Sequence, residues 1–170
     1  MPIVRTRPAR PARPAVQASA SFTALDETHR QIAQMLADLE RLPSLLSRPD
    51  GEAEAAALAE GACRFFNGAA RQHHETEETF VFPSLLGGAD ADLLALVRRL
   101  QQDHHWIEED WLELEPHLQA VAQGWRDDHV AFLRAALPEF TALQHEHIEL
   151  EESVIYPEAR QRQRAPGTPA

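Results

Sequence analysis

The sequence predicts an all-α protein, an up-down-up-down antiparallel four-helix bundle built from a duplicated helix pair. Ala, Leu, Glu, Gln and Arg dominate its 170 residues, and these residue types favour helix over strand. In four segments, apolar residues recur at alternating steps of four and three, which is the spacing of one buried helix face. Short links separate the segments, as in bundles whose neighbouring helices run antiparallel.

Helices are expected over four ranges, 21–42, 52–82, 90–115 and 126–156. Hydroxyl residues near the start of the first, Ser21 and Thr23, can cap its N-terminus. Proline lacks a backbone N–H and crowds the preceding turn, so it ends or bends a helix. We therefore expect helix ends at Pro43, Pro83, Pro116 and Pro157, and a bend at Pro138.

The bundle is expected to span residues 21–159, between two basic tails. Residues 1–20, rich in Pro and Arg, predict a disordered arm, and residues 160–170 predict a disordered tail. All sixteen basic residues are arginine, and the tails contain no acid, so the body has 9 Arg against 27 Asp and Glu, a formal charge of −18. A body this acidic argues against a nucleic-acid-binding core and suits a site for cations, although most of its acids are expected on solvated helix faces.

The cellular compartment is suggested by the single cysteine, Cys63, which cannot form an internal disulfide. No apolar run approaches the roughly 20 residues of a membrane span, and no apolar segment follows the basic N-terminus as in a signal peptide. We therefore expect a cytoplasmic protein that does not enter a membrane.

The duplication is visible in the apolar stripes. The stripe of the first helix recurs 75 residues later in the third, as Leu25, His29, Ile32, Leu36 and Leu39, then Leu100, His104, Ile107, Trp111 and Leu114. The stripe of the second recurs 74 residues later in the fourth, as Ala59, Cys63, Phe66, Ala70, His73, Glu77 and Phe80, then Leu133, Leu137, Phe140, Gln144, His147, Glu151 and Val154. Histidine, alone or with glutamate, interrupts every stripe.

Six ionisable groups thus occupy core positions, namely His29, His73, Glu77, His104, His147 and Glu151. A carboxylate buried without a partner tends to change its pKa and become neutral. Two carboxylates among four imidazoles are better explained by metal ions, and nitrogen and oxygen donors suit iron, manganese or zinc. The nominal arrangement is two histidines per metal, with both glutamates able to bridge and with coordination positions left open.

The remaining His and Glu residues need a separate interpretation, because a single His-x-x-x-Glu pair is a weak signal and the chain contains six. Only the set above is both repeated and on the apolar stripes. The other histidines are expected at the surface or around the ligands, namely His74, His105, His117, His129 and His145. Glu78 and Glu152 are also repeated, but point about 100° from the stripe and are expected to orient ligands. Cys63 aligns with Leu137 and is expected to be a small core residue.

The repeated pattern, with its Glu-Glu…Phe-Pro and Glu-Glu…Tyr-Pro endings, resembles the hemerythrin-like family (the HHE cation-binding domains) over residues 21–158. The resemblance implies a non-haem di-iron centre in a four-helix bundle, with Glu77 and Glu151 as bridging ligands and the four histidines as terminal ligands. Oxygen-carrying members have a further His four residues after the helix-3 His, where this chain has Glu108. The four-His, two-Glu set is closer to the bacterial branch, which includes iron–sulfur cluster repair proteins.

These observations favour a cytoplasmic di-iron protein that binds or reacts with O2, NO or peroxide in sensing, detoxification or iron handling. One alternative is an iron–sulfur cluster repair protein, although the Pro/Arg arm stands where those proteins carry a cysteine-containing domain. Another is a non-redox structural module holding zinc, which needs fewer ligands than six. A ferritin-like oxidase is disfavoured because no His here has a Glu three residues before it.

Overall fold

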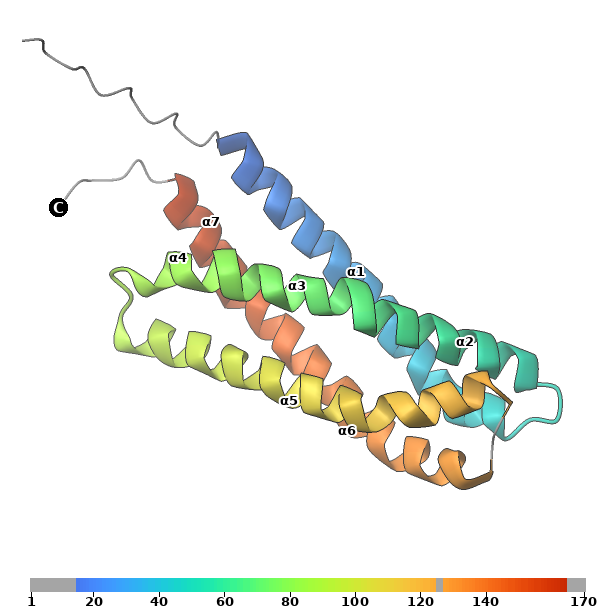
Figure 1. The fold of residues 1–170 in the computed structure, drawn as a ribbon. Coiled ribbons are helices and arrows are strands. Elements are labelled where there is room, and N and C mark those ends of the chain that lie inside the picture. The colour runs from blue at the N-terminus through green and yellow to red at the C-terminus, as the bar shows by residue number, and fades with distance from the viewer. Residues whose placement is uncertain (1–14, 125–126, 165–170) are drawn as a thin grey trace, which may run out of the picture.

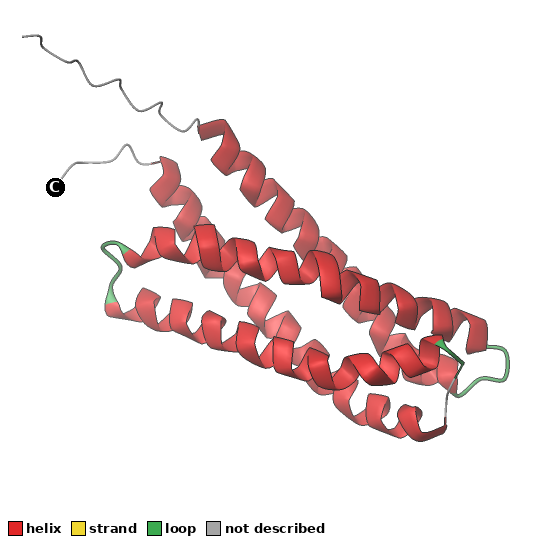
Figure 2. Ribbon diagram, in the orientation of Figure 1, coloured by secondary structure: helices red, strands yellow, loops and turns green. Residues whose placement is uncertain are grey.

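The computed structural model describes residues 15–124 and 127–164, and it contains helices and no strand within these ranges. Four helical rods lie side by side along most of their length (Figures 1 and 2). The first and third rods are single helices, α1 (Ala15–Leu46) and α5 (Ala91–Ala122). The predicted all-α four-helix bundle is therefore confirmed.

The second and fourth rods are α-helices interrupted by π-helical turns, labelled η. The second comprises α2 (Glu52–Phe65), η1 (Phe66–Ala70), α3 (Arg71–Thr76), η2 (Glu77–Val81) and α4 (Phe82–Leu86). The fourth comprises α6 (Asp127–Leu150), η3 (Glu151–Ile155) and α7 (Tyr156–Arg164). A π turn uses one residue more than an α turn. The turns η2 and η3 begin at Glu77 and Glu151, two of the predicted ligands.

The rods enclose one continuous interior, since α1 packs against α2 and α6, and α5 packs against the same two helices. Two apolar clusters fill it. One includes Ile32, Leu39 and Phe140, and the other includes Leu100 and Tyr156. On every rod the predicted ligands lie between residues of the two clusters, so a polar layer is enclosed between two apolar ones.

Prolines do not end the helices as predicted. Pro43 and Pro116 lie inside α1 and α5, which continue to Leu46 and Ala122. The apolar stripe continues beyond each proline, with Leu45 and Leu118 among the buried residues, and burying it offsets the lost hydrogen bond.

Pro83 and Pro157 likewise lie within helical rods and do not end them. Each follows a π turn inside a continuous helical rod and is the second residue of α4 or α7, and the rod continues past it. Pro138 lies inside α6, at the position where a bend was expected.

The π turns also move the buried face of the second and fourth rods. Phe80 and Val154, predicted on the stripes, are 55% and 37% exposed. The residues that follow them are buried instead, namely Val81, Phe82, Ile155 and Tyr156. The extra residue in each turn delays the inward face by one position.

Helices extend past both predicted ends of the bundle. Helix α1 begins at Ala15, within the range predicted as a disordered arm, and the rest of that arm, residues 1–14, lies outside the described residues. Helix α7 extends to Arg164, into the range predicted as a disordered tail, because Arg160 and Arg162 contact the bundle. Residues 165–170 lie outside the described residues. None of the described helices is both long and apolar enough to cross a membrane.

Candidate metal centre

The six predicted ligands meet in the polar layer, and all six side chains are buried. Each of the four rods contributes one histidine, from α1, α3, α5 and α6. The two glutamates come from the first positions of η2 and η3. Histidines four residues before these positions lie one helical turn away on the same face, which is why His73 and His147 accompany Glu77 and Glu151.

Each glutamate lies between two histidine pairs. Glu77 places Oε1 3.4 Å from Nε2 of His73, and Oε2 3.4 Å from Nε2 of His104. Glu151 places Oε2 3.2 Å from Nε2 of His29, and Oε1 3.3 Å from Nε2 of His147. The two carboxylates therefore connect a His29–His73 pair with a His104–His147 pair, as bridging ligands would.

Several side-chain nitrogen and oxygen atoms in this layer, of the kinds that bind metals, are buried and have no hydrogen-bond partner. They include Nε2 of His73, His104 and His147, Oε2 of Glu77 and both oxygens of Glu151. Leaving a buried polar group unpaired costs about 1–3 kcal/mol, so a cluster of them needs a common partner. Two overlapping groups could each hold a cation, His29, His73, Glu77 and Glu151, and His74, Glu77, His104 and His147. The residues present therefore fit metal ions, with Glu77 in both groups.

Burial controls the protonation of this layer. It lowers the pKa of His73 to about 4, so the ring is neutral and can offer a lone pair at neutral pH. Burial raises the pKa of Glu151 to about 8, and the negative charge of Glu77 adds to that increase. Without a cation, burial and the charge of Glu77 therefore favour a proton on Glu151, and a bound cation would replace that proton.

Two more carboxylates hold the outer nitrogens of the rings. Oε1 of Glu78 lies 3.0 Å from Nδ1 of His104 and accepts its hydrogen bond. Oε1 of Glu152 lies at the same distance from Nδ1 of His29. These contacts are the ones expected if both residues orient ligands, as predicted. A carboxylate on Nδ1 leaves Nε2 directed toward the centre and makes that nitrogen a stronger donor.

Aromatic rings at corresponding positions of the two repeats pack on these histidines. Phe82 stacks on His104 at 5.5 Å between centroids, and Tyr156 stacks on His29 at 5.1 Å. Tyr156 also donates a hydrogen bond to Oε1 of Glu77 and lies 3.2 Å from Nε2 of His29. Sequence reasoning did not assign it a role, although the aromatic residue before Pro in both repeats was a usable signal.

Three further residues of the layer differ from their counterparts in the other repeat, and none of them was assigned a ligand role from the sequence, although Gln144 stands on the predicted stripe. The ring of His74, expected at the surface or around the ligands, stacks on that of His104 at 4.2 Å, with its Nε2 buried. Burial lowers the pKa of His74 well below its ordinary value. Asp103 is buried with Oδ2 3.7 Å from Nδ1 of His147, and the buried amide of Gln144 lies on α6 one turn before that histidine.

The other histidines lie elsewhere. His105 and His145 are exposed and pair with Glu109 and Glu40. His117 and His129 contact each other, with their Nδ1 atoms 3.0 Å apart.

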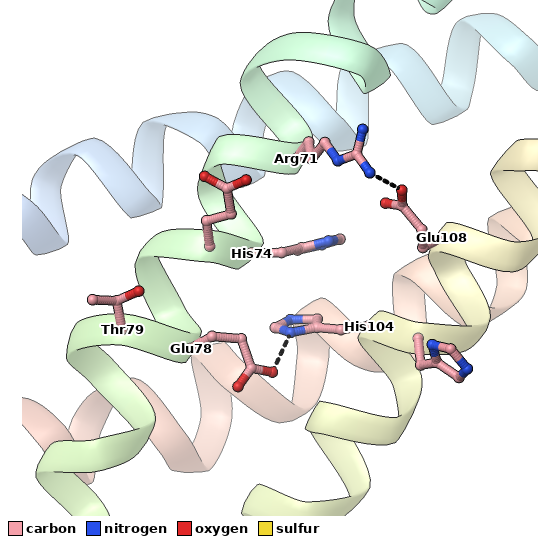
Figure 3. Close-up of a pocket in the computed structure, with 8 residues that line it drawn as sticks. Arg71, His74, Glu78, Thr79, His104 and Glu108 are labelled. Carbon is pink, nitrogen blue, oxygen red and sulfur yellow. Dashed lines mark hydrogen bonds and ion pairs between the residues drawn. The ribbon is translucent and has the colours of Figure 1, made fainter.

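A cleft of about 510 Å³ leads toward the centre between the second rod and α5. Figure 3 shows His74 and His104 projecting into it from opposite sides, with Arg71 and Glu108 paired beside them. Glu108, at the position of the additional histidine of oxygen carriers, belongs to this ion pair.

The fold and the site define a four-helix-bundle protein with a buried cluster of histidines and glutamates that could hold metal ions. The chain belongs to the hemerythrin family, since the family model of the hemerythrin HHE cation binding domain matches residues 21–159. This match confirms the resemblance inferred from the repeated motifs. Comparisons with curated proteins and with solved structures give no match.

Proposed function

We propose that this protein holds two iron ions and that they bind or react with O2, NO or peroxide. His29 and His73 would hold one ion, His104 and His147 would hold the other, and Glu77 and Glu151 could bridge them. The observation that carries the proposal is that each of the two carboxylates lies within 3.4 Å of a histidine from both pairs.

The donor set favours a redox-active metal with open positions. Imidazole nitrogens and carboxylate oxygens suit iron, and two bridging carboxylates with two imidazoles leave an octahedral ion short of ligands. Iron so bound supplies one-electron redox chemistry and positions for small ligands. Because Cys63 is the one cysteine of the sequence, we also propose a reducing, cytoplasmic location.

The chain's own residues determine what reaches the ions. The apolar clusters on both sides of the layer exclude water and bulky molecules from those directions, so the cleft beside His104 is the approach, and the buried layer favours diatomic ligands and peroxide. Tyr156 supplies a buried hydroxyl beside Glu77 and His29, where it can hold or donate a proton. Glu78 and Glu152 keep two of the rings in the orientation that binds metal.

The test is reconstitution with ferrous iron without oxygen, followed by metal analysis and by absorption and paramagnetic resonance spectra. We expect about two irons per chain, and spectral changes when the diferrous form meets O2 or NO and when the diferric form meets azide or peroxide. Binding of one metal at most under iron-replete conditions contradicts the dinuclear site. A loaded protein that responds to none of these ligands is instead the non-redox structural module.

A further inference from the structure

Two histidines outside the buried centre face each other at the end of the bundle that carries the link between α5 and α6 (Figure 1). His117 lies on α5 and His129 lies near the start of α6, and their Nδ1 atoms are 3.0 Å apart. His117 stands 13 residues after His104 on the same helix, which places it about 20 Å along the rod from the buried centre. The pair is therefore separate from that centre.

Packing holds the ring of His117 in position. It stacks on Phe132 of α6, with the ring centroids 3.9 Å apart and 11° between the ring planes. The ring of His129 meets it edge-on, at 5.0 Å and 71°. Both histidines are partly buried in the contact between the two helices. A ring that packing already holds loses little side-chain entropy when its nitrogen binds a ligand.

Two neutral imidazoles with facing Nδ1 atoms can be satisfied in two ways. Either one ring carries its hydrogen on Nδ1 and donates it to the other, or both rings carry it on Nε2 and both Nδ1 lone pairs bind a shared cation. Burial and the neighbouring His129 lower the pKa of His117, so its ring is neutral at neutral pH and offers a lone pair.

The separation of the two nitrogens fits a shared ion. Two nitrogens bound to zinc at about 2.0–2.1 Å lie about 3.3 Å apart at the tetrahedral angle. The Nδ1 atoms of His117 and His129 therefore have to move apart by only about 0.3 Å from their 3.0 Å separation to bind the same ion.

The surroundings of the pair are negatively charged. A cavity of about 70 Å³ next to Phe132 is lined by Asp110, Glu113 and Glu139. Within the described parts of the chain, none of these three carboxylates forms an ion pair. Burial and the charges of Glu113 and Glu139 raise the pKa of Asp110. Carboxylates without a basic partner raise the local concentration of cations, and Glu113 stands one helical turn before His117.

We propose that His117 and His129 form a second metal site, which binds one zinc ion through both Nδ1 atoms. Imidazole is a common zinc ligand, and water completes the four-coordinate shell. The ion links the end of α5 to the start of α6 across the turn between them. The site goes beyond the proposed function, because neither of its ligands belongs to the buried centre.

The experiment measures zinc bound per chain by equilibrium dialysis of the protein as purified. The variants are His117→Phe, which keeps an aromatic ring against Phe132 but has no nitrogen, and His129→Gln. At a free zinc concentration that fills the wild-type site, each variant should hold one zinc ion fewer per chain than the wild type. Any metal in the buried centre cancels in this difference, so the result does not depend on iron.

His145→Phe is the matched control, because His145 is an exposed histidine that pairs with Glu40. It should hold as much zinc as the wild type. Equal zinc contents in the wild type and in either of the two site variants overturn the site, and so does an equal loss of zinc in His145→Phe.

Nuclear magnetic resonance of the wild-type protein tests the same site without any variant. On addition of zinc, the Nδ1 resonances of His117 and His129 should shift together, and neither nitrogen should carry a hydrogen. A hydrogen-bonded pair would instead keep one protonated Nδ1 that zinc leaves unchanged. That result, or a shift of one ring alone, overturns the site even where the variants fail to fold.

Discussion

Each histidine of the metal centre has two ring nitrogens, and its neighbours decide which one faces inward. Glu78 occupies Nδ1 of His104 and Glu152 occupies Nδ1 of His29, so Nε2 of both rings is directed at the carboxylates of Glu77 and Glu151. Glu78 and Glu152 therefore orient buried histidines by accepting hydrogen bonds at the ring nitrogen that faces away from the centre.

Glu78→Gln tests this positioning role. The amide keeps the size of the side chain but lacks the negative charge that strengthens the ring as a donor, so we expect iron affinity to fall by roughly 10–100-fold. Competition with a chelator measures it. Glu75→Gln is the control, because Glu75 is exposed and pairs with Gln72. Equal affinities of the two variants would contradict the role.

Cys63 should be chemically inert in the folded protein. Burial raises the pKa of its thiol to about 11, and the charge of Glu115 adds to the increase. At pH 8 roughly one thiol in a thousand is then ionised, and the thiolate is the reactive form. We expect alkylation by iodoacetamide to be at least tenfold slower in the folded protein than in guanidinium chloride. Equal rates would show that the thiol is accessible and ordinary.

The helices carry the metal centre through paired irregularities rather than through ideal geometry. The turns η2 and η3 start at Glu77 and Glu151 and are followed by Phe82-Pro83 and Tyr156-Pro157. Each turn places the ligand and, five residues later, the ring that stacks on a histidine of another rod. The duplication therefore preserves a local backbone distortion as well as a set of side chains.

The link between α1 and α2 brings Gly51 close to the backbone of Leu45, and this approach is testable with glycine variants. A Cβ added at Gly51 would lie 2.1 Å from the carbonyl oxygen of Leu45, which is a backbone atom and cannot move alone. Gly51→Ala should lower the free energy of unfolding by about 1–3 kcal/mol.

Gly61→Ala is the matched control for that variant. A Cβ added there, in the interior of α2, meets nothing within 4 Å, so the change should stabilise the protein by about 0.5–1 kcal/mol. Urea denaturation of the two metal-free variants measures both effects. Similar stabilities would mean that the α1–α2 link rearranges without cost.

The molecule as a whole places its most polar layer in its interior, so its stability should depend on the metal. Buried metal-binding atoms without a hydrogen-bond partner, such as Oε1 of Glu151, lose their contact with water on folding, and a bound cation would replace that contact. Free iron at 100 times its Kd adds about 2.7 kcal/mol, which for a chain of this size raises Tm by roughly 5–10 °C. Anaerobic calorimetry with and without a chelator measures the shift, and an unchanged Tm would contradict a buried metal centre.

The C-terminal helix α7 connects α1 to the end of α4 at one end of the bundle. Arg160 donates to both oxygens of Asp26 at 2.6 Å, and its guanidinium carbon lies 4.9 Å from the ring centre of Phe22. Arg162 donates to the carbonyl oxygens of Leu85 and Gly87, each at 2.8 Å. Residues 160–164 thus belong to the folded unit.

Truncation should reveal this boundary. Deleting residues 1–14 and 165–170 should leave helicity and metal content intact, whereas Arg160→Ala should cost about 1 kcal/mol through the lost ion pair and ring contact. Arg164→Ala, at the exposed end of α7, is the control. Thermal unfolding by circular dichroism measures all three, and a large loss on truncation would mean that a terminal segment docks on the bundle.

The sequence by itself determined the four rods, their antiparallel order and six of the residues in the polar layer. Helical periodicity and a repeat at 74 and 75 residues are local properties that can be counted along the chain, and burial of Leu36 or Leu114 follows from them. Glu78 and Glu152 were predictable for the same reason, because they share the repeat and stand next to the ligands.

Only the tertiary structure decided the features that depend on packing between rods. Spacing does not reveal a π turn, so Phe80 and Val154 were expected inside where Val81 and Tyr156 lie. Helices pass their prolines because the apolar stripe continues against other rods. His74 has no repeated partner, and α5 determines that its ring meets His104. The physical reason is common to all of these: a side chain's partner on another helix is not a property of its own segment.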